Sequence, residues 1–388
     1  MKIAILTAGT LPVPAVRGGA VENLIDFYLD YNDKYKLHDI TVYSISHKKI
    51  KNHPATKSTS NHYHYIEVFN LISKISKNIF KLTHRNCFYD YAEEFFLAKA
   101  IKHIKKQVYD IIIIENRPGF ALKLKDKTSA RIVYHLENDY LNPKIKDYQD
   151  IYNIAYRILN TSEYISQCVK VINPDDTKCR TVLNGINTEI FYKAQPIGRE
   201  TLGIGKDDFV IVYSGRLTED KGILQLIQAI KSLGYLPHLK LLIIGASKYG
   251  KDLSANTYIQ TLEQEAAPIK DRVIFTGFLN YVQIPSYLKA CDIAVVPSLW
   301  EEPFGLTVVE AMAAGLPLIT TNSGGIPEIC KDVAIIVERQ HIVEQLSKAI
   351  VELYYHPNKR SQMSLASLRQ SRYFTKEEFA QNYFAALE

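Results

Sequence analysis

The stretch FVIVYSGRLTEDKGILQLIQAI, residues 209–230, indicates the fold of the second half of the chain. Its first five residues are β-branched or aromatic, which is typical of a strand buried on both faces of a parallel sheet. Gly215 then permits a sharp backbone turn, and the apolar periodicity from Ile223 to Leu233 predicts a helix. A strand, a glycine turn and a helix in this order form one unit of a doubly wound α/β domain.

The same alternation of strands and helices extends over the whole chain. In this half it predicts strands at 239–244, 272–276, 292–297, 316–320 and 334–338, and a helix at 342–355. In the first half it predicts strands at 2–7, 40–44, 111–115, 131–135 and 170–173, and helices at 21–29 and 91–106. A polar stretch with Pro196 and Gly198 separates the halves. We expect Rossmann-like doubly wound parallel-sheet domains at 1–192 and 193–373, and a helix within 374–388.

Composition and targeting signals favour a soluble cytoplasmic protein. The 388 residues are 47% hydrophobic and 23% charged, as in ordinary globular proteins. No apolar run approaches the ~20 residues of a membrane-spanning helix, and the start lacks the pattern of a secretory signal. Five scattered cysteines with no C-x-x-C pair predict buried reduced thiols: Cys87, Cys168, Cys179, Cys291 and Cys330.

The densest cluster of chemistry-bearing residues is PSLWEEPFGLTVVEAMAAG, residues 297–315. A strand is expected to end at Pro297, a loop to carry Glu302, and a helix to open at Gly305 with Glu310 in its first two turns. Open α/β sheets bind ligands at this edge, and a helix start favours a phosphate. Glutamates near a helix start are also common as caps, but the Pro-Phe-Gly context makes that alternative less probable for the whole cluster.

A second cluster, SGRLTEDKG at residues 214–222, directly follows a predicted strand. Arg216 can form two hydrogen bonds to phosphate oxygens and Lys221 adds a point charge, so the two side chains can neutralise a diphosphate. The alternative is that both are solvated or paired with Glu219 and Asp220.

A third cluster, RGGAVE at residues 17–22, opens the first predicted helix and could form an anion cradle or a plain tight turn. The dinucleotide fingerprint G-x-G-x-x-G, the P-loop and a D-x-D metal triplet are absent. We therefore expect no metal and no cofactor.

In this order, the clusters resemble the retaining glycosyltransferases of family 4, which have the GT-B fold of two Rossmann-like domains that face a cleft. The resemblance covers nearly the whole chain. It is carried by Gly18-Gly19, the histidine in Val133-Tyr134-His135, VLNGINTEIF at 182–191, Gly215-Arg216-Leu217, Lys221-Gly222, Gly277-Phe278-Leu279, the Glu302 and Glu310 pair, and NSGGIPE at 322–328. Asn187 departs from the usual aspartate. The opening residues look most like members that act in surface-polysaccharide or spore-coat assembly.

The resemblance implies a nucleotide-sugar donor and assigns a role to each motif. Arg216 and Lys221 would hold the diphosphate, Glu310 the ribose, and Glu302 the sugar hydroxyls. The donor site would also include Gly19, Gly215, Gly277, Phe278, Leu279, Phe304, Gly305, Leu306 and Thr307. His135 would approach the sugar from the acceptor side, and Glu137 and Asp139 could meet acceptor hydroxyls. In the family, the C-terminal helix returns to the first domain.

The resemblance also implies reaction on one face of the sugar, in which the leaving phosphate takes the proton of the acceptor and no side chain is a nucleophile. UDP is expected as the carrier because it is frequent in the family, and the acceptor would be a saccharide or a lipid-linked saccharide. Two alternatives are a non-catalytic sugar-nucleotide-binding or coat-structural protein and a sugar-nucleotide epimerase. The intact Arg216, Lys221, Glu302 and Glu310 argue against the first, and the Glu302 and Glu310 loop argues against the second.

The excess positive charge lies in the first half, which the resemblance makes the acceptor side. Residues 1–190 contain 27 Lys and Arg against 20 Asp and Glu, whereas 191–388 contain 20 against 21. Within the lysine-rich stretch 48–85, residues 71–82 place Ile72, Ile75, Ile79 and Leu82 on one face of a predicted helix. Such a helix could contact the anionic inner face of the plasma membrane, or simply pack its apolar face on the domain. Nucleic acid is not expected, because no binding module is present.

Overall fold

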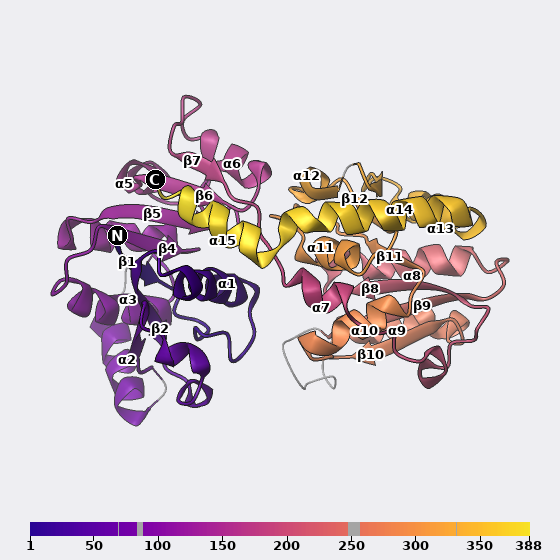
Figure 1. The fold of residues 1–388 in the computed structure, drawn as a ribbon, viewed down its shortest axis with the longest axis horizontal. Coiled ribbons are helices and arrows are strands. Elements are labelled where there is room, and N and C mark those ends of the chain that lie inside the picture. The colour runs from indigo at the N-terminus through magenta and orange to yellow at the C-terminus, as the bar shows by residue number, and fades with distance from the viewer. Residues whose placement is uncertain (69, 84–87, 247–256, 331) are drawn as a thin grey trace. The chain divides into compact units, whose positions relative to one another are not determined.

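The computed structural model describes residues 1–68, 70–83, 88–246, 257–330 and 332–388. The chain divides into a first unit, Met1–Gly185 with Lys376–Glu388, and a second unit, Ile186–Thr375 (Figure 1). Helix α7 (Thr188–Tyr192) packs on helices of the second unit and buries Phe191 there. The second unit therefore begins before the polar stretch from which we expected a boundary at 193. Arg85 and Cys87 lie outside the described residues.

In its described residues, the first unit contains a seven-stranded parallel sheet. Its strands are β1 (Lys2–Leu6), β2 (Asp39–Ile45), β3 (Asn61–Ile66), β4 (Ile111–Glu115), β5 (Arg131–Leu136), β6 (Arg157–Asn160) and β7 (Cys179–Thr181). They lie in the order β3-β2-β1-β4-β5-β6-β7, so the direction of winding reverses between β1 and β4.

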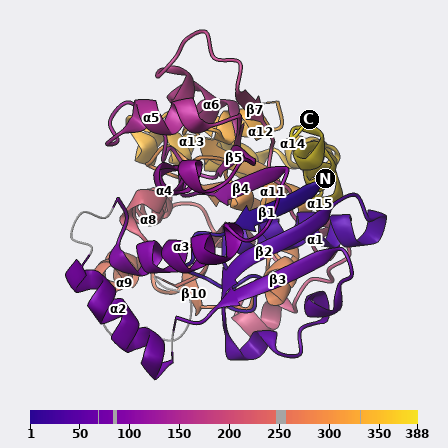
Figure 2. The ribbon, with the colours of Figure 1, turned by 90° about the vertical axis from the view of Figure 1, so that its left-hand side faces the viewer.

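Helices cover both faces of this sheet. On one face, α1 (Ala20–Tyr35) and α15 (Lys376–Ala385) form one hydrophobic core with the strands. On the other face, a second core includes α3 (Tyr91–Ile104), α4 (Ala121–Leu124), α5 (Tyr148–Ile154) and α6 (Glu163–Lys170). Figure 2 shows α1 and α3 on opposite sides of the sheet, with α2 (Leu71–Thr83) at the margin of the unit.

The second unit, within the described residues, contains a six-stranded parallel sheet in the order β10-β9-β8-β11-β12-β13. Its strands are β8 (Phe209–Ser214), β9 (Leu239–Ile244), β10 (Val273–Gly277), β11 (Ile293–Val296), β12 (Leu318–Thr321) and β13 (Ala334–Val337). Its further helices are α8 (Ile223–Ser232), α9 (Thr257–Ala266), α10 (Ile284–Lys289), α11 (Leu306–Ala313), α12 (Ile326–Cys330), α13 (Ile342–Tyr355) and α14 (Pro357–Gln370). Two Rossmann-like doubly wound parallel-sheet domains are thus confirmed.

One predicted strand is wrong, and three strands were missed. Residues 170–173 form the end of α6 and a turn, because Ser162 caps a helix at Glu163–Lys170 and Val171 is 66% exposed. The missed strands are β3, β6 and β7, which are short or carry polar residues.

None of the described helices is long and apolar enough to cross a membrane. Among the described cysteines, Cys179, Cys291 and Cys330 are free and buried, and Cys168 is half-buried.

Candidate active site

The donor-side residues predicted from the sequence follow two neighbouring strands of the second unit. Strands β8 and β11 pair directly, and the chain leaves β8 toward β9 but leaves β11 toward β12, on the opposite side. Such a reversal of strand order opens a crevice at the carboxyl ends of the two strands, where open α/β sheets bind ligands. The turn 215–222 and the loop that carries Glu302 both start at this place.

The turn after β8 and the loop after β11 are joined through their backbones. Gly222 has a φ of 69°, and a Cβ at this position would lie 2.0 Å from the carbonyl oxygen of Pro297. Both the positive φ and this close approach require glycine. The backbone N–H of Leu299 also donates to the carbonyl of Asp220, with an N···O distance of 2.8 Å. These contacts fix the neighbouring Lys221 relative to the Glu302 loop.

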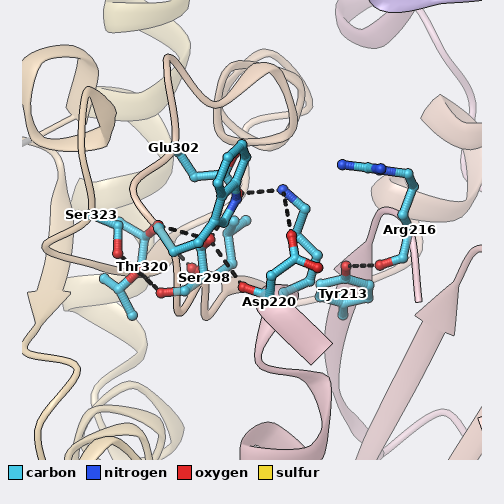
Figure 3. Close-up of polar contacts among 11 residues, drawn as sticks. Tyr213, Arg216, Asp220, Ser298, Glu302, Thr320 and Ser323 are labelled. Atoms are coloured by element: carbon cyan, nitrogen blue, oxygen red, sulfur yellow. Dashed lines mark hydrogen bonds and ion pairs between the residues drawn. The ribbon is translucent and has the colours of Figure 1, made fainter. Parts of the chain in front are cut away.

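Lys221 and Glu302 form the central ion pair of the site. The Nζ atom of Lys221 lies 2.6 Å from Oε1 of Glu302 and 3.9 Å from Oδ2 of Asp220. The hydroxyl of Ser298 donates to the same Oε1 at 2.8 Å, and the ring centroid of Trp300 lies 4.9 Å from Nζ (Figure 3). Glu302 is only 9% exposed, so a cation and a hydroxyl stabilise its charge where water is scarce.

The Glu302 loop is supported by the residues that follow β12. A Cβ at Gly324 would lie 2.2 Å from the carbonyl oxygen of Glu302, and the N–H of Gly325 donates to that oxygen at 2.8 Å. The hydroxyl of Ser323 donates to the carbonyl of Ser298 at 3.0 Å (Figure 3). The Gly-Gly segment of the resemblance therefore acts by holding the carboxylate loop in place.

Arg216 is exposed and extends toward the side of the turn on which Glu302 lies (Figure 3). Its backbone carbonyl accepts a hydrogen bond of 2.7 Å from the hydroxyl of the buried Tyr213. Gly215, the residue before it, donates its N–H to the carbonyl of Ile244 at the end of β9. The backbone at Arg216 is therefore fixed, while the guanidinium remains accessible to an anion.

Helix α11 begins directly after Gly305, which has a φ of 111°. Leu306 and Thr307 form its first turn, where backbone N–H groups have no partner within a helix. Phe304 is 3% exposed and packs against Phe374, with a distance of 6.0 Å between the ring centroids. Phe304 can therefore meet a ligand through its backbone rather than its ring.

Glu310 lies in α11 and is 7% exposed. Burial raises the pKa of Glu310 to about 7, and a hydrogen bond with the hydroxyl of Tyr281 opposes this rise. Tyr281 follows Gly277, Phe278 and Leu279 after β10, and the ring of Phe278 is 48% exposed. The second unit thus holds a second buried carboxylate in the helix that starts at the Glu302 loop.

Predicted acceptor-side residues lie in the first unit. His135 is the penultimate residue of β5 and is fully buried: Nδ1 lies 2.7 Å from Oε2 of Glu115, and Nε2 lies 3.1 Å from Oε1 of Glu137. Glu137 is 9% exposed and Asp139 is exposed. Since His135 has no exposed surface, Glu137 and Asp139 are the members of this group that an acceptor could touch.

Gly19 lies after β1, immediately before α1, with a φ of 115°. A Cβ there would lie 2.0 Å from Oε2 of Glu22, so Glu22 closes one side of this turn. Glu22 is 6% exposed, and burial raises its pKa to about 7. Among the described residues, no group of three or more His, Cys, Asp and Glu is arranged to hold a metal ion.

Sequence reasoning assigned no role to four residues that the fold brings to these sites. Ser298 and Tyr281 contact Glu302 and Glu310, and Glu115 and Asn184 contact the His135 and Glu137 pair. Ser298, Glu115 and Asn184 all lie at or just after the carboxyl end of a strand. That position is the one sequence signal that could have identified them.

The sequence of this chain is similar to those of known proteins. Residues 195–369 match the family described as glycosyl transferases group 1. Spore coat protein SA of Bacillus subtilis is 28% identical over an alignment of 407 residues, which covers 100% of this chain and 99% of that protein. The UDP-Gal:alpha-D-GlcNAc-diphosphoundecaprenol alpha-1,3-galactosyltransferase of Escherichia coli is 32% identical over 257 residues, which cover 59% of this chain and 62% of that enzyme.

The fold agrees as well. The crystal structure of Anabaena HepE in complex with UDP and glucose has a TM-score of 0.72 and 20% sequence identity, and the match covers 100% of this chain and 99% of that one. This similarity confirms the expected GT-B fold. The second unit therefore contains a glycosyl transferases group 1 domain at residues 195–369, and the chain as a whole has the GT-B fold.

Proposed function

We propose that this chain transfers a sugar from a UDP-sugar to a saccharide or lipid-linked acceptor, with retention of the anomeric configuration and without a metal. The observation that carries the proposal is the Lys221 and Glu302 pair, 2.6 Å apart, at the point where the strand order of the second sheet reverses. A cation and an oriented carboxylate in one crevice suit a ligand that carries both phosphates and hydroxyls.

Lys221 and Arg216 would bind the diphosphate. Lys221 and Ser298 both donate hydrogen bonds to Oε1 of Glu302. We therefore assign Oε2 to the hydroxyls of the transferred sugar. The first N–H groups of α11, from Leu306 and Thr307, would complete the phosphate contacts.

Glu310 would accept hydrogen bonds from the ribose, and the segment 277–279 would lie along the base. The partly exposed ring of Phe278 supports this, because a flat apolar ring can stack on a base. UDP is preferred because it is frequent in the family that the sequence resembles, and HepE is one structural relative that binds it.

In the proposed reaction, the bond between the anomeric carbon and the β-phosphate oxygen breaks, and the acceptor oxygen attacks on the same face. The acceptor proton passes to the departing phosphate, so no side chain becomes a nucleophile. Lys221 and Arg216 would stabilise the negative charge that develops on the diphosphate, which is the role that a metal ion has in other transferases. Glu302 would orient the sugar and stabilise the positive charge at its anomeric carbon.

We further propose that α2 places the enzyme at the inner face of the plasma membrane, where a lipid-linked acceptor would be met. Ile75 and Ile79 are 55% and 57% exposed, and Lys74 and Lys81 are exposed on the same helix. The side chains of Ile72 and Leu82 lie outside the described part. Apolar residues beside lysines suit an anionic bilayer surface.

The chain should float with vesicles that contain phosphatidylglycerol, and the double variant Ile75→Ser, Ile79→Ser should not. Equal flotation of both would exclude this role for α2.

A non-catalytic coat protein with the same fold is the second candidate, because spore coat protein SA is similar over the whole chain. The two candidates differ in turnover. With a panel of UDP-sugars and saccharide or undecaprenyl-diphosphate-linked acceptors, a transferase releases UDP and forms a glycosylated product. The Glu302→Gln variant should bind UDP but lose this product. Binding of UDP by the wild type without turnover on any acceptor would favour the coat protein.

A further inference from the structure

A buried series of polar contacts connects the C-terminal helix with the end of β5. The hydroxyls of Tyr28 in α1 and Tyr383 in α15 both donate to Oε1 of Glu115, at 3.0 and 3.1 Å. The other oxygen of Glu115, Oε2, lies 2.7 Å from Nδ1 of His135. Nε2 of His135 lies 3.1 Å from Oε1 of Glu137. Five side chains from distant parts of the sequence thus form one series that ends at a carboxylate.

Only the last member of the series reaches the surface. Tyr28, Tyr383, Glu115 and His135 are each 0% exposed, whereas Glu137 is 9% exposed. The rings of Tyr28 and Tyr383 stack at 4.2 Å between centroids, and Tyr383 also packs edge-on against His135 at 5.0 Å. The four buried members can therefore act on a ligand only through Glu137.

Charge explains why a histidine occupies the middle of the series. Burial lowers the pKa of His135, but the charges of Glu115 and Glu137, together with the hydrogen bond to Glu115, raise it to about 10. At neutral pH the ring is then an imidazolium, which can donate from both nitrogens, whereas a neutral imidazole could serve only one carboxylate. Of the other titratable groups near this network, Tyr28 and Tyr383 contact Glu115 and Glu22 interacts with its charge; burial raises the pKa of both tyrosines, so they remain neutral donors.

The Glu137 carboxylate is held in place through Oε2, but its Oε1 has no hydrogen-bond partner in the described part of the chain. The amide of Asn184 donates to Oε2 of Glu137 at 2.5 Å, and the N–H of Glu137 donates to the side chain of Asn116 at 3.1 Å. The contact between His135 and Glu137 is an ion pair that lacks hydrogen-bond alignment, and Oδ1 of the buried Asn184 has no partner in the described part of the chain. Buried polar atoms left in this state favour a ligand hydroxyl, which can both donate and accept.

We infer that Glu137 binds a hydroxyl of the saccharide acceptor, and that His135 is a positioning residue which Glu115 and the C-terminal helix, through Tyr383, hold behind it. This inference rests on the proposed transferase function. The sugar contact that was expected for His135 is thereby assigned to Glu137, and α15 becomes part of the acceptor site.

The first test needs no acceptor. Nitrogen-15 NMR of the full chain labelled in histidine should show the ring of His135 protonated on both nitrogens from pH 6 to pH 8.5. The Glu115→Gln variant should return its titration toward the usual range for histidine. A neutral tautomer of His135 in the wild type at pH 7 would overturn the inference, whatever the enzymatic activity.

The second test separates acceptor use from donor binding. With an acceptor found in the UDP-release panel, Glu137→Gln and His135→Gln should each raise the acceptor KM about tenfold or more, since a hydrogen bond to a charged group is lost. Tyr383→Phe should produce a smaller rise, and Tyr373→Phe, at a residue that is 74% exposed, should produce none. The Kd of UDP, measured by calorimetry, should stay within about twofold in the Tyr383→Phe and His135→Gln variants.

The outcomes distinguish a failure of the proposed transferase function from a failure of the positioning role of His135 and Tyr383. If the wild type binds no UDP, the proposed function fails. If UDP binds and turns over but Tyr383→Phe behaves like Tyr373→Phe and His135→Gln leaves the acceptor KM unchanged, the positioning role of the network fails. Should His135→Gln not fold, Tyr383→Phe and the NMR titration decide the question.

Discussion

The Glu310→Gln variant should gain stability relative to the wild type as the pH rises, and it should bind UDP more weakly. Glu310 is 7% exposed, and burial raises its pKa from an ordinary value of 4.5 to about 7. The folded state therefore holds this proton more tightly than the unfolded state does. Folding stability must then fall as the pH rises from about 4.5 to about 7, because folding opposes the ionisation.

The size of the effect follows from these two pKa values. Between pH 5 and pH 8, the wild type should lose about 2.5 kcal/mol of unfolding free energy through this one group. Glutamine cannot ionise, and its carbonyl can still accept from the hydroxyl of Tyr281. At about 2–4 °C per kcal/mol for a unit of this size, the Tm difference between variant and wild type should change by about 5–10 °C. The constant cost of burying an amide cancels, because it is the same at both pH values.

Tryptophan fluorescence is a suitable probe, since Trp300 is the one tryptophan of the sequence and lies in the same unit as Glu310. Thermal unfolding would be followed at pH 5 and pH 8 for the wild type, for Glu310→Gln and for a control, Glu263→Gln, at an exposed position of α9. A Tm difference that does not change with pH would refute the raised pKa. An unchanged UDP affinity in Glu310→Gln would refute the ribose contact.

Two further predictions concern the turn after β8. Lys221→Met should reduce the rate of UDP release about 10²- to 10³-fold, because a group that stabilises the developing charge is lost, while Lys231→Met on the exposed side of α8 should have no effect. Similar losses in both variants would argue against a specific role. Gly222→Ala should lower the Tm by several degrees, since strained backbone conformations cost about 1–3 kcal/mol and the new Cβ would also meet a carbonyl oxygen at 2.0 Å. A wild-type Tm would show that the turn relaxes readily.

Most strands that were predicted from sequence are buried along nearly their whole length, although β10 and β13 were also predicted and are mostly half-buried. Residues 111–114 of β4 are all isoleucine and fully buried, and β9 is buried at five of its six positions. Strand β3, Asn61–Ile66, reads NHYHYI and lies at the edge of the sheet, where its side chains are partly exposed. An edge strand needs no continuous apolar run, so the pattern that identifies its neighbours does not identify it.

The site residues likewise divide into those that could be predicted from sequence and those that could not. Glu302, Lys221 and Glu310 stand in local motifs, so their approximate places follow from strand ends and helix starts. Their partners depend on the folded chain: Lys221 and Glu302 are 81 positions apart, and Tyr383 and Glu115 are 268 positions apart. No periodicity or spacing can predict such contacts, because they arise from the order of strands in each sheet and from the packing of α15 on α1.

The two units share one physical arrangement, to which the proposed function assigns different ligands. In each, a carboxylate of 9% exposure is paired with a cation at the carboxyl end of a parallel sheet: Glu302 with Lys221, and Glu137 with His135. Burial favours the neutral form of a carboxyl group, and it raises the pKa of Glu22 and Glu310. A paired cation favours and orients the charged form of a carboxylate, which can accept hydrogen bonds from hydroxyl groups. The cations differ in exposure: Lys221 is partly exposed and, in the proposed function, would also meet a diphosphate, whereas His135 is fully buried behind Glu137 and, as we infer, would only hold it.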